Sequence, residues 1–122
     1  MTVTTDQAQE VAATIRSQID RGVLMSLGAH HFAYGTDQMG QLSFVARVLP
    51  FTKLGHRSAR VANMVVTITL NGLDYYDITV THWVNFERTI HAEGHDIDAF
   101  TLNRWLLALD YDGDTALNPR YI

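Results

Sequence analysis

Two runs of alternating residues on either side of Asn71-Gly72 constrain the fold of this chain more than any other feature. In an extended strand, successive side chains point to opposite faces, and Asn-Gly is a strong signal for a tight turn. We therefore expect strands over 61–70 and 76–86 that pair as an antiparallel hairpin. The positions that share one face are Met64, Val66, Ile68 and Leu70 before the turn and Tyr76, Ile78, Val80, His82, Val84 and Phe86 after it.

The length of the connecting loop decides which residues of the hairpin face each other. A loop of two residues places Val66 opposite Asp77. An odd loop of three or five residues keeps apolar residues opposite each other, with Ile68 opposite Tyr76. Because a shift of one residue turns every side chain to the other face of the sheet, we expect an odd loop and a bulged hairpin. Asp74 and Asp77 flank the turn and are expected to bond backbone amides.

A helical stripe precedes the strands. Apolar residues recur at every fourth position, which is the spacing of one face of a helix. Thr5 suits an N-cap and Gly28 suits the residue after the last turn, so we expect a helix over 6–27 that Gly22 kinks or splits. The stripe consists of Val11, Ile15, Ile19, Val23 and Leu27, flanked by Ala8 and Ala12.

Short segments between the helix and the hairpin have strand character. Residues 29–34 are aromatic and bounded by glycines, and residues 42–49 alternate until Pro50 ends the run. After the hairpin, residues 88–95 are polar and contain Gly94, which predicts a loop.

A second helix closes the domain, with Asp96 or Asp98 as its cap. The tail from about residue 110 is expected to be irregular. We therefore expect a single α+β domain over 1–122 in the order α-β-β-β-β-α, with both helices packed on one face of an antiparallel sheet. The apolar positions of the closing helix are Ile97, Phe100, Leu102, Trp105, Leu106 and Leu109.

Composition narrows the chemistry open to this domain. The chain has 122 residues, of which 47% are hydrophobic and 18% charged, as is typical of a folded domain with its own core. It has no cysteine, which excludes disulfides, zinc–thiolate sites and thiol catalysis. The sequence shows no secretory signal and no apolar stretch of membrane-spanning length, so the expected setting is the cytoplasm.

The formal net charge of −4 hides two oppositely charged regions. Four cations and no acid lie between residues 47 and 60, whereas nine acids and two arginines lie between 74 and 114. Because the chain is acidic overall, we expect only limited nucleic-acid contact, through the loop 52–60. The expected partner-binding residues are Lys53, Arg57 and Arg60 in that loop and Glu93, Asp96 and Asp98 in the acidic segment. An ordinary solvated surface loop is the competing interpretation of 52–60.

His91, Glu93 and His95 form the candidate metal-binding cluster. Histidines four residues apart share one face of a helix, which is a spacing used by zinc sites. Gly94 opposes a helix here, and zinc proteases have their glutamate directly after the first histidine. A solvated polar connection is the competing interpretation.

Other polar residues suggest weaker sites. Asp110, Asp112 and Asp114 alternate as in part of a calcium loop, but no bidentate acid follows them. His30 and His31 are adjacent, so on a strand they point to opposite faces and do not clamp one ion. The sequence has no Gly-x-Ser-x-Gly motif, phosphate-binding glycine loop or dinucleotide fingerprint, so no catalytic residue and no cofactor is predicted.

The order of these motifs resembles that of a known group of proteins. The motifs are Leu27-Gly28, Phe32, Leu42-x-Phe44 and Ile68-Thr69-Leu70-Asn71-x-x-Asp74-x-Tyr76-Asp77. This combination, over roughly residues 19–110, is similar to small uncharacterised proteins encoded by phages and prophages. The resemblance implies a phage or mobile-element origin and brings no catalytic assignment.

A non-enzymatic binding protein is the function we expect. Trp83, Tyr75 and Tyr34 fall on positions that leave the core, and exposed aromatic residues beside charged patches are typical of protein interfaces. The protein would act in the bacterial cytoplasm by occupying a host or phage macromolecule, for example to inhibit a host defence system. The alternatives are a metal-dependent hydrolase or nuclease built on the histidine cluster, and a homo-oligomeric structural or accessory protein joined through an edge strand at 29–34 or 42–49.

Overall fold

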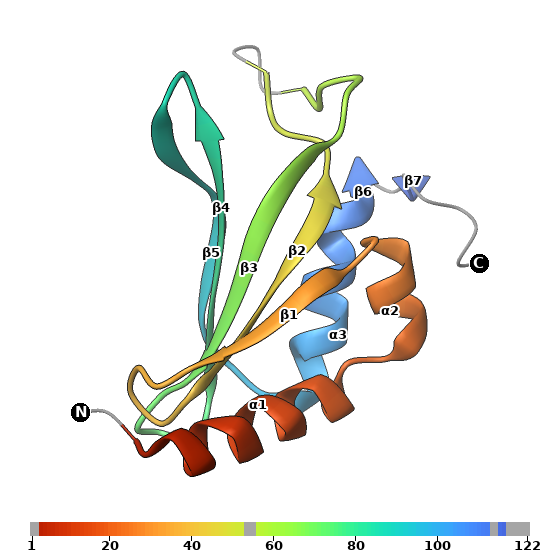
Figure 1. The fold of residues 1–122 in the computed structure, drawn as a ribbon. Coiled ribbons are helices and arrows are strands. Elements are labelled where there is room, and N and C mark those ends of the chain that lie inside the picture. The colour runs from red at the N-terminus through yellow and green to blue at the C-terminus, as the bar shows by residue number, and fades with distance from the viewer. Residues whose placement is uncertain (1–2, 53–55, 113–114, 117–122) are drawn as a thin grey trace.

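Five antiparallel strands follow one another in chain order across the sheet (Figure 1). The computed structural model describes residues 3–52, 56–112 and 115–116 of the chain. The strands are β1 (His30–Gly35), β2 (Gln41–Val48), β3 (Ala62–Leu70), β4 (Tyr76–Val84) and β5 (Glu87–Ile97), and the helices are α1 (Thr5–Gln18), α2 (Arg21–Ser26) and α3 (Ala99–Leu107). The predicted α+β class is confirmed, with one more strand in the sheet and one more helix than expected.

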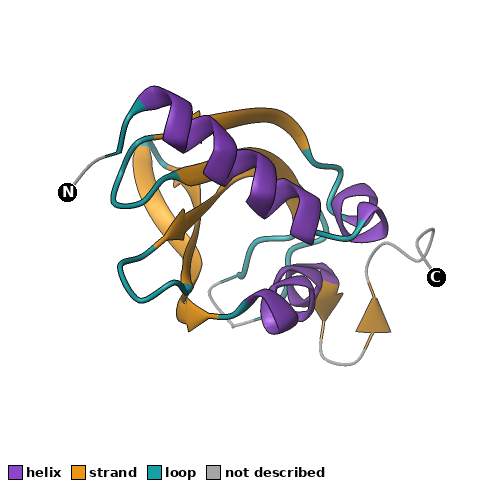
Figure 2. Ribbon diagram, turned by 90° about the horizontal axis from the view of Figure 1, so that it is seen from below, coloured by secondary structure: helices purple, strands orange, loops and turns teal. Residues whose placement is uncertain are grey.

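The helices cover one face of the sheet, as predicted (Figure 1). Seen from below in Figure 2, α1 lies lengthwise while α3 is viewed end-on, so the two helices cross the sheet in different directions. The alternation of the strands explains which face they cover, because every second residue of β2 and β3 is buried. The buried apolar strand residues are Leu42, Phe44, Ala46, Val48, Met64, Val66, Ile68, Tyr76, Ile78, Val80 and Ile97.

The expected N-terminal helix is divided into α1 and α2, and the break lies at Ile19 and Asp20 instead of Gly22. Asn103 of α3 stabilises the break. Its side-chain amide donates to the carbonyl of Gln18 at 2.9 Å, and its side-chain oxygen accepts from the amide of Asp20 at 2.7 Å. These bonds satisfy backbone groups at the end of one helix and the start of the next.

The predicted helix ends are confirmed in part. Gly28 follows α2 with a φ of 61°, the left-handed conformation that glycine commonly adopts at this position. Asp98 caps α3 by accepting a backbone hydrogen bond in its first turn. Thr4, in place of Thr5, caps α1. Phe100, expected in the core, is instead 95% exposed, whereas Leu102 and Leu106 on the same helix are buried as expected.

The turn between β3 and β4 has the odd length that the alternation predicts, and it comprises the five residues 71–75. The register places Leu70 opposite Tyr76 and Ile68 opposite Ile78. The expected pairing of Ile68 with Tyr76 is therefore wrong by two residues, which leaves every side chain on its predicted face.

The segment 88–95, predicted as a loop, forms most of the edge strand β5. The strand has a glycine at position 94 because α3 packs closely on it and leaves no room for a side chain. A Cβ at this position would lie 2.6 Å from Nε1 of Trp105, and a glycine within a strand often marks such a close approach. The polar composition of the segment reflects its place at the edge of the sheet.

The opposite edge of the sheet is β1, whereas β2 lies inside it. Of the two seams expected for self-association, only 29–34 is therefore at an edge. His31 has a φ of 56° within an irregularity of the ladder after His30. The two imidazole rings consequently meet, with 4.8 Å between their centroids, and the expectation that they point to opposite faces is wrong.

The chain beyond α3 forms a short 3-10 helix, η1 (Ala108–Asp110), and two short strands, β6 (Tyr111–Asp112) and β7 (Thr115–Ala116), which pair with each other. The tail, expected to be irregular, thus contains a small two-stranded element within the described residues.

Candidate functional site

Four exposed apolar side chains belong to the β4–β5 hairpin or to the part of β3 that pairs with it, namely Val65, Trp83, Phe86 and Ile90. We term them the hairpin surface. Trp83 is 72% exposed and Phe86 is 98% exposed. Figure 1 shows this hairpin extending beyond the helices, so that no helix covers its tip. Contiguous exposed apolar patches mark sites of interaction.

The register of the strands explains why these residues lie together. Val65 lies opposite Thr81, and Thr81 lies opposite Ile90, which gives one row across β3, β4 and β5. Trp83 is two residues further along β4, opposite Arg88. Because Val65 alternates with the buried positions of β3, this row lies on the face of the sheet that the helices leave open. Thr81, in the middle of the row, is itself buried.

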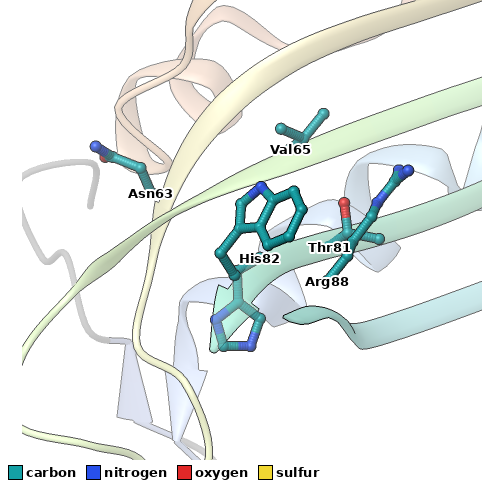
Figure 3. Close-up of a pocket in the computed structure, with 6 residues that line it drawn as sticks. Asn63, Val65, Thr81, His82 and Arg88 are labelled. Carbon is teal, nitrogen blue, oxygen red and sulfur yellow. The ribbon is translucent and has the colours of Figure 1, made fainter. Parts of the chain in front are cut away.

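The row borders a hollow of about 180 Å³ (Figure 3). Its lining residues are Asn63, Val65, Thr81, His82, Trp83 and Arg88. Val65 and Trp83 contribute the apolar part of this lining, while Asn63 and Arg88 contribute hydrogen-bond donors. An apolar centre with polar residues around it is the usual anatomy of a protein-binding surface.

The tip of the hairpin has a strained backbone. Val84 pairs with Glu87, so the turn consists of Asn85 and Phe86. Their φ values of 51° and 68° are both left-handed, a geometry for which Asn-Gly is preferred. A residue with a Cβ costs about 1–2 kcal/mol in this conformation. Phe86 carries that cost without burying its ring, and strain of this kind concentrates at functional sites.

The cations predicted to bind a partner have different environments. Lys53 lies outside the described residues. Arg57 donates to the carbonyl of Leu49 at 2.7 Å, and its guanidinium carbon lies 4.7 Å from the centroid of the Phe51 ring. These contacts hold Arg57 within the loop itself. Arg60 is exposed.

The predicted acidic segment has mainly structural contacts. Asp98 accepts a hydrogen bond of 2.8 Å from a backbone amide in the first turn of α3, which lowers the pKa of its carboxyl group. Asp96 accepts from the side chain of Asn71 at 2.9 Å. Glu93 is exposed on β5. Asp96 and Asp98 lie where β5 meets α3, whereas the loop between β2 and β3 is at the other end of the sheet (Figure 1). The two charged regions therefore do not form one surface.

The structure separates the candidate metal ligands. The β4–β5 ladder slips by one residue at His91, and such a bulge interrupts the alternation of side chains. The ring of His91 lies 6.1 Å from that of His82, between centroids, whereas Nδ1 of His95 lies 3.5 Å from the carboxylate of Asp77. Glu93 belongs to neither contact. In the part of the chain that the structure describes, no three His, Cys, Asp or Glu side chains are placed to hold one metal ion.

His91 instead joins β5 to the loop that follows β2. Its ring stacks on that of Phe51 with 4.9 Å between centroids. Burial, together with the charges of Arg57 and His82, lowers the pKa of His91 to about 4. The imidazole is therefore neutral at neutral pH, and its visible role is structural.

The prediction of exposed aromatic residues is confirmed. The three aromatic residues expected outside the core are exposed: Tyr34, Tyr75 and Trp83.

Asp77 bonds a backbone amide, that of Asp96, at 3.1 Å, as expected. The alternation pattern predicts Phe86 on a strand, whereas the structure places it in the turn after β4. The preceding Asn85 could have indicated this turn, because asparagine favours turns. Of the suggested calcium loop, Asp110 is buried and residues 113–114 lie outside the described residues.

A scan against protein-family models finds no match for this chain, and searches of the curated proteins and of the solved structures find none either. Among the described residues, no helix has both the length and the apolar character needed to cross a membrane.

Proposed function

We propose that this protein is a non-enzymatic binding module that docks onto a partner protein through the hairpin surface. The observation that carries the proposal is the exposure of Trp83 and Phe86 at the end of a hairpin with a strained turn. Tryptophan is among the residues most enriched in the small group that dominates the binding free energy of interfaces. The neighbouring hollow gives an apolar side chain of the partner a place to bind.

A protein partner fits this surface better than a nucleic acid. Interfaces with nucleic acids are polar and strongly positive, whereas the described residues of the hairpin surface and its hollow include one arginine, Arg88, and no lysine. Glu87 and Glu93 lie on the same strand and would repel phosphate groups.

The resemblance of the chain to small phage and prophage proteins supports a phage or mobile-element origin. On this proposal the protein acts in the bacterial cytoplasm. It occupies a surface of a host or phage protein and thereby blocks the other contacts of that protein, which is how it would inhibit a host defence system.

Affinity capture with matched variants tests the proposal. Immobilised protein is incubated with a bacterial lysate, and the retained proteins are identified by mass spectrometry. We expect one stoichiometric partner on the wild type and at least about tenfold less of it on Trp83→Ser, because an anchoring aromatic residue often contributes about 2 kcal/mol or more. Phe100→Ser is the control, since Phe100 is also an exposed aromatic residue but lies on α3.

Two outcomes contradict the proposal. The first is the absence of a stoichiometric partner, and the second is a partner that Trp83→Ser retains as well as the wild type does. Sedimentation of the same proteins adds a third test. A dimer that Trp83→Ser dissociates would assign the hairpin surface to self-association instead of to a different protein.

A further inference from the structure

Two adjoining hollows lie between the N-terminal helices and the edge strand β1. One, of about 230 Å³, lies between α1 and β1, and the other, of about 240 Å³, extends to α2. Arg16 and Phe32 line both hollows, so that together they form one groove. We term it the arginine groove, after Arg16 and Arg21, which line it together with Leu24, Phe32 and Tyr34.

The floor of the arginine groove is apolar. Phe32 is half-buried, and its ring packs against that of Phe44 in the core with 5.4 Å between centroids. Leu24 is half-buried as well, and Met25 beside it is 61% exposed. Covering apolar surface of this kind releases water and favours binding.

Arg16 is held over this floor by an aromatic ring. Its guanidinium carbon lies 3.8 Å from the centroid of Phe32. In such a stack the flat face of the guanidinium touches the ring, and the N–H donors point outward in its plane, where a carboxylate can bind them. Within the described part of the chain, neither Arg16 nor Arg21 forms an ion pair, even though Asp20 stands between them in the sequence.

We propose that the arginine groove binds an extended acidic segment of a partner protein. A carboxylate of the segment pairs with Arg16, and an apolar side chain two residues away, on the same side of the extended segment, lies against Phe32. Two hollows in succession suit alternate side chains of an extended peptide, because residues i and i+2 point to the same side. In addition, β1 is at the edge of the sheet, where its backbone can pair with an added strand. The acidic character follows from charge complementarity with Arg16 and Arg21.

The arginine groove is distinct from the hairpin surface. The groove lies along β1, whereas the hairpin surface is built on β3, β4 and β5, toward the other edge of the sheet. The inference therefore goes beyond the proposed function, and either one can fail without the other.

Selection from a displayed library of random octapeptides tests the inference. Immobilised wild-type protein is expected to enrich peptides that combine Asp or Glu with a large apolar residue. Arg16→Gln should weaken the binding of an enriched peptide by at least about tenfold, measured by fluorescence polarisation, because it removes a charge-assisted pair. Replacing the acids of the peptide with Asn and Gln should have a similar effect.

Matched variants separate the groove from general charge and from the hairpin surface. Arg104→Gln removes the same charge from an exposed position on α3 and should bind the peptide like the wild type. Trp83→Ser should also bind it unchanged. Arg16→Lys keeps the charge but loses the planar stack, so its affinity should be intermediate. Thermal unfolding shows that each variant is folded. A failure to enrich acidic peptides, or equal binding by Arg16→Gln, overturns the inference.

Discussion

Asn71 is the polar residue on which the turn between β3 and β4 depends. Its buried side-chain oxygen accepts from the amides of Leu73 and Tyr75 at 2.9 and 3.2 Å. Its side-chain nitrogen donates to the carboxylates of Asp77 and Asp96 at 3.2 and 2.9 Å. All four hydrogen-bonding positions of the side chain are therefore used, and they join the turn to the end of β5.

Asn71→Ala is expected to lower the free energy of unfolding by about 2–4 kcal/mol, because it leaves the two amides and the two carboxylates without this partner. Urea denaturation followed by circular dichroism measures the loss. Gly72→Ala is the control within the same turn, since a Cβ there meets nothing within 4 Å, and it should change stability by no more than about 0.5 kcal/mol. A loss below about 1 kcal/mol for Asn71→Ala would contradict this role of the network.

Elements with a local signal could be predicted from the sequence, whereas elements that depend on distant partners could not. The stripe of α1 and the alternation of β3 are visible in their own residues. β5 could not be predicted from its own residues, because its hydrogen bonds are made with β4. Gly94 indicates a loop in the sequence, whereas in the structure it makes room for Trp105. The break between α1 and α2 is hidden for the same reason, since Asn103 stabilises it from a position 83 residues away from Asp20.

The contact between β5 and the loop after β2 makes stability depend on pH. Burial lowers the pKa of His91 from 6.5 to about 4, with further contributions from Arg57 and His82. Between these pH values the unfolded chain binds a proton at His91 that the folded protein does not. The contribution of His91 to the free energy of unfolding is therefore fully present above about pH 6.5 and decreases as the pH drops toward 4. We expect a loss of about 1–2 kcal/mol from this group, because solvent screens part of the effect on a half-buried ring.

Urea unfolding at about pH 7 and about pH 4.5 measures this loss. His91→Phe keeps an aromatic ring against Phe51 but does not titrate, so it should lose about 1 kcal/mol less than the wild type between the two pH values. His56→Gln is the control, because it removes an exposed histidine, and it should follow the wild type. Equal losses in wild type and His91→Phe would assign the pH dependence to other groups.

At the scale of the whole molecule, the sheet has one part whose apolar side chains are buried under the helices and another part, the tip of the β4–β5 hairpin, whose apolar side chains are exposed. The helices cover one part, and the β4–β5 hairpin extends past them (Figure 1). The sequence indicates that Trp83 is exposed, but the rest of the hairpin surface depends on register. The two-residue turn exposes Phe86, and the slip at His91 places Ile90 opposite Thr81. The arginine groove is hidden from the sequence for a similar reason, since its walls come from the helices and from β1.

This division predicts that the tip of the hairpin is not optimised for stability. Phe86→Gly should raise the free energy of unfolding by about 1 kcal/mol, because glycine adopts the left-handed φ of 68° without steric cost. Phe86→Ala removes the same ring but keeps the strained backbone, so it should gain little. The difference between the two variants, measured by urea denaturation, isolates the backbone strain.

The same pair of variants connects stability with binding. Both should capture less of the partner than the wild type, since both remove the exposed ring, while only Phe86→Gly gains stability. That combination would mean that Phe86 is retained at a cost to the fold, which is the pattern expected where a surface serves binding. Equal stability of the two variants would show that the turn is unstrained, and the proposed function would then rest on the exposure of Trp83 and Phe86 alone.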